Sequence, residues 1–363
     1  YEFVLPAFFV AVYDVTATGA ISGKATTTFT DANSAGNLEQ CRNGSAGSPN
    51  NCASLGGGTG WVTGNAGASQ AHYVEGYSIP YREIMTDIPT GTSVTIVLGY
   101  DIRNGSKNAI DFLTHYLRLE PHASFGHTAE TVSPLSGVSG VSATVSTFAI
   151  PAPSSAGSPV AGQPTTSFNS LPAGERLMTL FGGTITNVAY VSQGSLTASQ
   201  SETQIAITFT ADSTTAVLAW GGHIARCIDW GTTAGVCNSA AGISGSPYHM
   251  RQISWTLGNL GNQDRSLSAG AVQAAGNLII NKVAIGGNDT FNYTTTGSGL
   301  SNFSITTSGG AGSQSFNNLL AGAKTVTESA PPTGWDFTSL TCSDPDNGTT
   351  TSGAAANVDL DPG

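Results

Sequence analysis

The fold of this chain is decided by the stretch Ser93–Tyr100, which reads SVTIVLGY. A run of this kind, rich in β-branched residues and ending on an aromatic one, is typical of a strand with at least one buried face. Similar runs bounded by Gly, Asn, Asp, Thr or Ser occur at Gly140–Ile150, Thr203–Phe209 and Ala216–Trp220. The sequence therefore predicts an all-β fold.

One segment departs from this pattern. Lys107–Glu120 reads KNAIDFLTHYLRLE, and in it Ile110, Leu113, Tyr116 and Leu117 recur at helical spacing. This spacing predicts a short helix with those four side chains on one face. Almost no other window of eleven residues carries a helical period.

Composition excludes several classes of protein. Charged residues make up 10% of the 363 residues, against about 25% in an ordinary soluble domain. Lys and Arg number 12 and Asp and Glu 23, so the net charge is −11, and a nucleic-acid partner is excluded because phosphate binding needs a basic footprint. A hydrophobic content of 39% is too high for disorder. No run approaches the roughly 20 apolar residues of a membrane span, so we expect none.

The five cysteines fall as two close pairs and one single residue. Cys41 and Cys52 enclose ten residues, and Cys227 and Cys237 enclose nine. Neither spacing is the CxxC of a zinc knuckle or a thioredoxin-like site. We therefore expect two disulfide-closed loops and an oxidising, extracellular compartment, with free thiols in a cytosolic protein as the alternative. Cys342 is left over, which in a secreted protein suggests a missing partner.

The chain divides into parts of different composition. We expect an apolar N-terminal strand at residues 1–20, a large jelly-roll-like β-sandwich at 21–275 and a small β-sandwich at 276–363. Within the large part, Pro151–Ser167 has four prolines and is interpreted as a surface excursion or a linker. The expected strands of the small part are Leu278–Val283, Thr290–Thr294, Phe303–Thr306, Ser315–Leu320 and Ala323–Thr327.

The small C-terminal part resembles a known family. The residues that carry the resemblance are Ile280 and Lys282 in an I-x-K strand, Thr290-Phe291, the block TVTESAPPTGW from Thr325 to Trp335, and Cys342 after it. On these, residues 277–343 are similar to the prealbumin-like modules of bacterial secreted and surface proteins. The resemblance implies a small transthyretin-like sandwich that serves as a stalk or spacer and carries no chemistry of its own.

The region at about 70–275 also resembles a domain of large bacterial surface proteins, one of uncharacterised function. The resemblance implies architecture and a surface location rather than an activity. The motifs that carry it are HYVEGYSIPYRE (His72–Glu83), YDIRNGSKNAIDFLTHY (Tyr100–Tyr116), AVLAWGGHIARCIDWG (Ala216–Gly231), SGSPYHMR (Ser244–Arg251) and GNQDRSLSAGAV (Gly261–Val272).

The sequence departs from the prealbumin-like pattern at its end. The family's terminal module closes on a strand of the form acidic-Thr-Val-x-Cys-x-Phe-x-Asn, and this sequence ends at Asp361-Pro362-Gly363 before such a strand. The resemblance therefore implies a module that lacks its last strand, together with the natural partner of Cys342. A sandwich of that kind would have an open edge prone to pair with another chain.

The N-terminal segment Tyr1–Val15 reads YEFVLPAFFVAVYDV and is apolar on both faces, like a strand buried from both sides. Burying it would contribute about 10–20 kcal/mol before entropy costs. It is either the first strand of its own sandwich or a strand donated to a neighbouring subunit by β-strand addition. Head-to-tail donation does not close on itself and would build a filament. The residues expected at that subunit contact are Phe3, Val4, Leu5, Phe8, Phe9, Val10 and Val12.

One group of histidines has the composition of a metal site. His115, His122 and His127 lie within thirteen residues, with Glu120 among them. Their spacing matches no helical i, i+4 pair and no zinc pattern. We therefore interpret them as structural histidines and expect no metal there.

Two carboxylates near these histidines raise the question of acid–base catalysis. Paired carboxylates need a cleft that separates their pKa values, and nothing in the sequence indicates a cleft around Asp101, Asp111 and His115. We interpret Asp101, close to Asn104-Gly105, as a turn residue. The sequence therefore predicts no catalytic residues here.

The segment His223–Arg265 is densest in polar and aromatic residues. The favoured interpretation is a buried network in which Arg251 or Arg265 faces Asp229 or Asp264. The alternative is a carbohydrate-binding face that recognises surface glycans, for which the stacking surfaces would be Trp230 and Tyr248.

Known catalytic motifs are absent from the sequence. It contains no G-x-S-x-G elbow, no P-loop and no H-E-x-x-H. Part of a calcium-loop pattern is present at Asp344, Asp346 and Asn347, but the full pattern is not. Weak calcium binding is therefore the only cofactor interaction we consider. We expect a non-enzymatic structural subunit of an extracellular bacterial filament or surface stalk, joined to copies of itself head to tail by β-strand addition. The alternative is a carbohydrate-binding surface adhesin.

Overall fold

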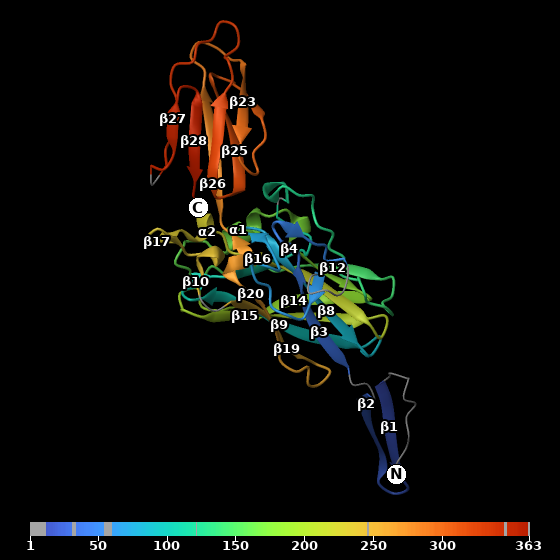
Figure 1. Cartoon of the computed structure of the whole chain (residues 1–363). Helices are drawn as coiled ribbons and strands as arrows, with labels where there is room; N and C mark the ends of the chain where they lie inside the picture. The colour runs from blue at the N-terminus through green and yellow to red at the C-terminus, as the bar shows by residue number, and fades with distance from the viewer. Residues whose placement is uncertain are drawn as a thin grey trace.

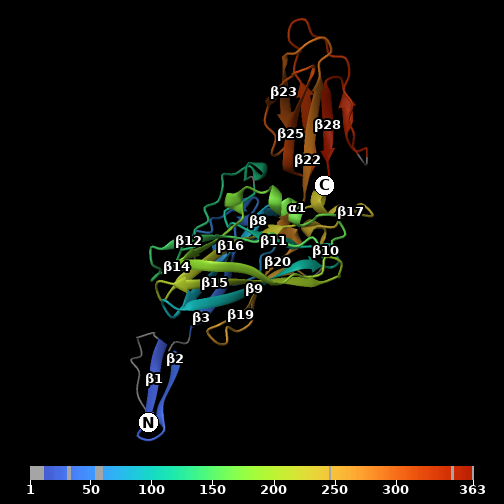
Figure 2. The ribbon, with the colours of Figure 1, turned by 180° about the vertical axis from the view of Figure 1, so that it is seen from behind.

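The molecule consists of three parts in a row. Figures 1 and 2 show a hairpin near the N-terminus, a large body of two sheets, and a C-terminal module at the end of the body opposite the hairpin. The helices are short: η1 (His122–Phe125), α1 (Thr165–Ser170), η2 (Ala173–Glu175), α2 (Cys227–Trp230), η3 (Ala240–Gly242) and η4 (Ala269–Ala271). This computed structural model describes residues 12–30, 34–53, 60–120, 122–244, 247–344 and 347–361.

The first sheet of the body contains β9 (Ser93–Asn104), β10 (Lys107–Asn108), β14 (Gly183–Ser192), β15 (Ser201–Ala211), β19 (Tyr248–Trp255) and β20 (Gln263–Leu267). Its strand order is β14-β15-β9-β19-β20, with β10 also paired to β9, and every pairing is antiparallel. The run SVTIVLGY forms the first eight residues of β9. The two-residue turn from β9 to β10 places Gly105 and Ser106 at φ of 56° and 66°, and positive φ at both central residues is characteristic of a type I′ hairpin turn.

The second sheet contains β3 (Ala35–Arg42), β6 (Gly60–Val62), β8 (Ser78–Thr86), β11 (Ile110–Thr114), β12 (Val145–Ala149), β13 (Leu177–Phe181) and β16 (Ala216–Ile224). Its order is β12-β13-β16-β8-β3-β6, and β11 also pairs with β16. Outside the two sheets lie short pairs: β4 (Gly44–Ser45) with β5 (Ser48–Pro49), β7 (Tyr73–Val74) with β21 (Val272–Gln273), and β17 (Thr232–Thr233) with β18 (Val236–Cys237).

One hydrophobic core lies between these sheets. Side chains of β15 alternate between buried and half-buried, as expected of a strand with one face on a core. All nine residues of β16 are buried. Tyr81 and Trp220 from the second sheet and Tyr100 and Phe209 from the first belong to the same cluster. The body is therefore the expected large β-sandwich.

The expected helix in Lys107–Glu120 is wrong. The chain there forms β10, a short break and β11, and every residue of β11 is buried. Ile110 pairs with Ile224, and Phe112 with His223, in β16. Because this segment is buried all round, its apolar residues do not need to follow a strand period, and their helical spacing is a coincidence.

The C-terminal module has two facing sheets. The smaller pairs β22 (Ala275–Val283) with β25 (Ala311–Leu320), and the larger has the order β24-β23-β26-β28-β27. The strands of the larger sheet are β23 (Thr290–Thr296), β24 (Phe303–Thr306), β26 (Gly322–Glu328), β27 (Thr350–Ser352) and β28 (Ala355–Leu360). Side chains of β22 pack against the cluster around Phe291 and Tyr293, so the module is a small sandwich. The five expected strands are present, and β27 and β28 were not expected.

The hairpin β1 (Val12–Gly19) and β2 (Gly23–Thr30) is a separate two-stranded sheet. The sequence predicts that residues from 21 onward belong to the large sandwich, and for residues 21–30 the structure differs. Instead β2 pairs only with β1, and most side chains whose exposure is described in this hairpin are exposed. The charged residues Asp14 and Lys24 and the run of threonines at 26–28 supply little apolar surface for a core. The interpretation of Tyr1–Val15 as the first strand of its own sandwich therefore does not hold for residues 12–15.

Candidate metal centre

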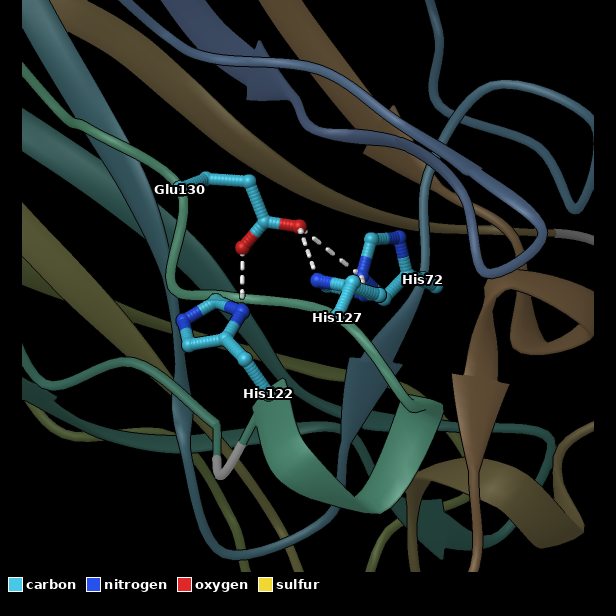
Figure 3. Close-up of side chains that lie close together, drawn as sticks. All are labelled: His72, His122, His127 and Glu130. Atoms are coloured by element: carbon cyan, nitrogen blue, oxygen red, sulfur yellow. Dashed lines mark hydrogen bonds and ion pairs between the residues drawn. The ribbon is translucent and has the colours of Figure 1, made fainter.

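Three histidines and one glutamate converge in the body next to η1. Figure 3 shows His72, His122, His127 and Glu130 pointing toward one another, with Glu130 paired to all three rings. One ligand atom from each of the four lies within 4.8 Å of the others. His72, His122 and Glu130 are buried and His127 is half-buried. Such a group of imidazole and carboxylate ligands is a candidate metal centre.

The side chain of Asn43 holds the backbone of His72 in place. Asn43 donates from its amide nitrogen to the His72 carbonyl oxygen at 2.8 Å and accepts from the His72 backbone N–H at 2.9 Å. The same amide donates to Glu120 at 2.8 Å, which fixes that carboxylate beside the cluster. His72 directly precedes β7, so its position is set from both sides.

The other ligands come from one turn of chain. His122 opens η1, Gly126 follows η1 with φ of 80°, and His127 and Glu130 come next. The positive φ of Gly126 reverses the chain direction, so that the two histidines flank the same carboxylate. Phe125 packs edge-on against His72 at 4.6 Å between ring centroids and thereby covers the cluster on one side.

Hydrogen bonds to backbone carbonyls define two of the imidazole tautomers. His72 Nδ1 donates to the Gly44 carbonyl at 2.8 Å, and His127 Nδ1 donates to the Thr128 carbonyl at 2.9 Å. Because a carbonyl oxygen can only accept, both Nδ1 atoms carry the proton. In the neutral rings both Nε2 atoms are then bare lone pairs, and they face each other at 3.1 Å.

The carboxylates add negative charge to the same space. His72 Nε2 lies 3.1 Å from Glu130 Oε1 and 3.9 Å from Glu120 Oε1, and His122 Nδ1 is in direct contact with Glu130 Oε2. Burial favours the neutral form of Glu130, but its pairing with His122 and His72 outweighs burial and holds its pKa at about 2. Burial raises the pKa of Glu120 to about 7. Burial alone would lower the pKa of His72, but Glu130, the Gly44 carbonyl and Glu120 outweigh it, and the net shift is upward.

Several buried polar atoms of the cluster lack hydrogen bonds. Within the described ranges, neither ring nitrogen of His122 and neither carboxylate oxygen of Glu130 has a hydrogen-bond partner of normal geometry, and Glu120 Oε2 has none. Close ion-pair contacts without hydrogen-bond geometry describe the Glu130 pairings instead. Orphaned polar atoms at a buried site call for an explanation such as a bound ion.

The sequence identified only part of this centre. Of the residues considered there, His122 and His127 are in the cluster and Glu120 lies beside it, whereas His115 is elsewhere and its Nδ1 accepts from the Leu117 N–H at 3.2 Å. His72 and Glu130 were missed. No sequence signal places His72 here, because it is 50 residues before His122 in the chain.

The two aspartates near these histidines do not form a catalytic pair. Asp101 lies within β9, not in a turn as expected, and it pairs with His249 and Arg251. The hydrogen bonds with His249 and Arg251 outweigh the effect of burial and lower the pKa of Asp101. Asp111 is fully buried in β11, where it pairs with His223 and accepts a hydrogen bond from Trp230 Nε1 at 3.1 Å. Each carboxylate is therefore held in its own structural network.

The carbohydrate-binding face proposed from Trp230 and Tyr248 is wrong. Trp230 is 2% exposed and Tyr248 is fully buried, so neither ring offers a stacking surface. Both belong to the hydrophobic core of the body. Their aromatic character serves packing, which is the more common role of such residues.

The expected buried network of Arg251 or Arg265 with Asp229 or Asp264 is wrong, because none of these pairs forms a salt bridge and Arg251 is half-buried. Asp229 pairs with Arg226 three residues before it, at 2.5 Å between Nε and Oδ2. Arg251 bridges Asp101 and Glu202 across neighbouring strands. Arg265 instead donates to backbone and amide oxygens, among them the Leu38 carbonyl. Short-range and cross-strand geometry therefore decided the pairs, which the sequence spacing did not indicate.

Disulfides join Cys41 to Cys52 and Cys227 to Cys237, and Cys342 is free and exposed. Of the expected subunit contact, Phe3, Val4, Leu5, Phe8, Phe9 and Val10 lie outside the described residues. Val12 begins β1, where it pairs with Thr30. Asp344 Oδ2 accepts from the Thr349 N–H at 2.7 Å, and Asp346 is not described, so calcium binding there stays a prediction.

Comparison with known proteins assigns the C-terminal module. Residues 278–363 match the model of a family described as a prealbumin-like fold domain, which confirms the resemblance of that part. No curated protein and no solved structure was found to match the chain. The match indicates a surface protein, in agreement with the two disulfides. In the described part of the chain, none of the helices has the length and apolar character needed to cross a membrane.

Proposed function

We propose that this protein is a structural subunit of an extracellular bacterial filament or surface stalk, and that neighbouring subunits join head to tail by β-strand addition. The observation that carries the proposal is the hairpin β1–β2. It projects from the body at the end opposite the C-terminal module (Figure 1). An isolated two-stranded hairpin is only marginally stable in water, so strands or a core from a second subunit would stabilise it.

The edges of the hairpin support strand addition. In the described residues β1 and β2 pair with each other and with no other strand, and an edge strand of this kind can act as a template for pairing with another chain. The sequence before it, residues 1–11, is strongly apolar and would gain from burial in a neighbour. Main-chain pairing would supply affinity, and the apolar side chains would fix the register.

The C-terminal module offers a complementary surface on β22. Ile279 and Val283 lie on the exposed face of that strand, with Asn281 between them, and are 59% and 69% exposed; Ile285 just beyond the strand is 88% exposed. Opposite them in β25 lie Ala311 and Ser315, which are small and uncharged. A contact between this stripe and the hairpin of the next subunit would join opposite ends of the molecule. Such a head-to-tail contact does not pair two subunits into a closed dimer, so further subunits can add to it.

The low content of charged residues favours close contact between subunits. Only 10% of residues are charged, so a contact between subunits would have few charged side chains to desolvate. The two disulfides limit the unfolded state of the body, as suits a protein outside the cell. Together these features fit a mechanical role rather than a catalytic one.

The experiment is a comparison of the full chain with a variant that lacks residues 1–30. We expect multi-angle light scattering to give masses of several chains for the full protein and the mass of one chain for the deletion variant. Circular dichroism should show the same strand content in the rest of both proteins. Two equal monomer masses, or two equal polymer distributions, would contradict the proposal.

A further inference from the structure

We propose that His72, His122, His127 and Glu130 bind one divalent transition-metal ion, for which Zn²⁺ is the best fit, and that this ion has a structural role. The site lies inside the body and involves no residue of the hairpin or of β22. The proposal is therefore independent of the mode of assembly.

The first argument comes from the facing nitrogens. The Nδ1 protons of His72 and His127 are both committed to backbone carbonyls, which leaves two lone pairs 3.1 Å apart. His72 Nε2 meets a further acceptor, Glu130 Oε1, at the same distance. Acceptors that converge in this way repel one another unless a cation lies between them, and the cation is either a proton on one ring or a metal ion.

The second argument distinguishes the metal from the proton. A single proton on His72 Nε2 satisfies that ring but does nothing for His122, whose Nδ1 meets Glu130 Oε2 in an ion-pair contact without hydrogen-bond geometry and whose Nε2 has no hydrogen-bond partner among the described residues. A metal ion accepts lone pairs from all three rings and the carboxylate together. Around a tetrahedral Zn²⁺ the ligand atoms are about 3.3 Å apart. Two of the pairs are observed at 3.1 Å, and all four ligand atoms lie within 4.8 Å of one another, so a bound ion would draw the more distant atoms inward.

The third argument is the set of ligand atoms. Three imidazoles and one carboxylate suit Zn²⁺ and its neighbours among the transition metals, whereas Ca²⁺ and Mg²⁺ prefer oxygen ligands. Four protein ligands fill a tetrahedral shell and leave no open position, as in structural zinc sites. Backbone carbonyls orient His72 and His127, and such outer contacts accompany metal-bound histidines in general.

The ion would hold a segment that has little other structure. In the described part of the chain between β11 and β12, η1 is the only helix and no strand occurs. His122, His127 and Glu130 belong to this segment, and His72 belongs to the neighbouring β7 region, so one ion ties the two together. From η1 the Ser124 carbonyl accepts a hydrogen bond from Ser298 of the C-terminal module. The ion therefore also fixes one contact between the body and that module.

The test is metal binding by the full chain after dialysis against a chelator. Isothermal titration with ZnCl₂ should give one Zn²⁺ per chain, and titration with Co²⁺ should give the strong visible absorption of a tetrahedral site. Millimolar Ca²⁺ should leave that absorption unchanged. Hydrogen exchange in residues 122–144 should slow when Zn²⁺ is added, because local opening of this segment becomes less frequent.

Variants show whether these four residues are the ligands. His72→Gln and Glu130→Gln should each lower Zn²⁺ affinity at least about 100-fold, beyond the roughly 10–100-fold of an outer-shell change. The matched control is His115→Gln, which changes a histidine of the same segment outside the cluster and should bind Zn²⁺ like the wild type. Circular dichroism in the absence of metal shows whether each variant is folded. The proposal is overturned if the wild type binds no Zn²⁺, if Ca²⁺ displaces Co²⁺, or if folded His72→Gln and Glu130→Gln proteins bind as the wild type does.

Discussion

Arg82 in β8 shows how a chain with few charges uses them. It is fully buried, pairs with Glu39 at 2.6 Å, and donates to the carbonyls of Pro134 and Ser136 at 2.7 and 2.8 Å. Its guanidinium also lies over the ring of Trp61 at 4.8 Å. One side chain thus connects β3, β6 and the segment that follows Glu130 of the candidate metal centre.

Replacing Arg82 should destabilise the folded protein. Arg82→Met leaves the Glu39 carboxylate unpaired and two carbonyls without donors, and we expect the free energy of unfolding to fall by about 3–5 kcal/mol. The control is Arg176→Met, whose half-buried side chain makes a single long hydrogen bond to Asn169 and should cost about 1 kcal/mol or less. Urea unfolding followed by tryptophan fluorescence measures both. Equal losses in the two variants would contradict the role of Arg82.

Glu75 should make stability depend on pH. Burial raises its pKa from 4.5 to about 7, although Ser239 and the backbone N–H groups of Ala241 and Cys227 donate to its carboxylate. Between pH 4.5 and 7 the folded chain keeps a proton that the unfolded chain has released. Stability therefore falls as pH rises through this range, by about 3 kcal/mol for this one group.

The comparison with Glu75→Gln isolates this effect, because the amide does not titrate. When the pH rises from 4.5 to 7, the unfolding free energy of the wild type should fall by about 3 kcal/mol relative to that of Glu75→Gln. Urea titrations at several pH values measure it. Parallel pH profiles for the two proteins would show that Glu75 keeps its ordinary pKa.

At the scale of elements, the sequence predicted strands well where one face is buried. The predicted strands include SVTIVLGY, Thr203–Phe209 and Ala216–Trp220, and all three lie within observed strands. A run of β-branched residues between turn signals favours a strand. The prediction failed at β11, where burial on all sides removes the alternation that distinguishes a strand from a helix. Strands β27 and β28 were missed because Val358 and Leu360 are the only large apolar residues between positions 350 and 360, which gives a weak strand signal.

The candidate metal centre could be predicted only in part from the sequence, for a related reason. His122 and His127 are five residues apart, which is not the i, i+4 spacing of a helical pair. Zinc fingers do contain an H-x3–5-H pair, but together with a C-x2–4-C pair that this sequence lacks. Their convergence depends on η1 and on the positive φ of Gly126, and the third histidine arrives from a distant part of the chain. Ligand sets assembled by tertiary structure cannot be read from local spacing.

The apolar stripe on β22 carries a prediction about assembly. Val283→Asp places a charge in the proposed contact, where it would be buried without a partner, and we expect it to shift the protein from polymers toward monomers. The matched control is Val191→Asp, at a valine that is 57% exposed on β14 of the body, compared with 69% for Val283. Sedimentation of the two variants at equal concentration measures the effect. If Val191→Asp dissociates polymers as well as Val283→Asp does, β22 is not the contact.

At the scale of the whole molecule, the all-β class and the C-terminal module followed from the sequence, and the relation between the parts did not. The body has one core shared by two sheets, and the module has its own clusters around Phe291 and Leu319. The hairpin belongs to neither. The sequence could not indicate this, because β-branched threonines such as those of β2 are as suitable for a sheet inside a sandwich as for one outside it.

Separate cores lead to a prediction about reduction. Both disulfides lie in the body, so a reductant should lower the unfolding temperature of the body and leave that of the module unchanged. Opening each loop of about ten residues should cost about 2–3 kcal/mol. Differential scanning calorimetry with and without dithiothreitol resolves the two transitions. An equal shift of both would show that body and module unfold as one unit.

The measurement that tests the central claim most directly is electron microscopy of the full chain at the concentration where light scattering detects association. Head-to-tail strand addition predicts unbranched filaments whose axial repeat equals the spacing of one subunit, with a hairpin-sized bridge between successive bodies. Removal of residues 1–30 should abolish them. Single particles of one chain at all concentrations, or closed rings, would contradict the account.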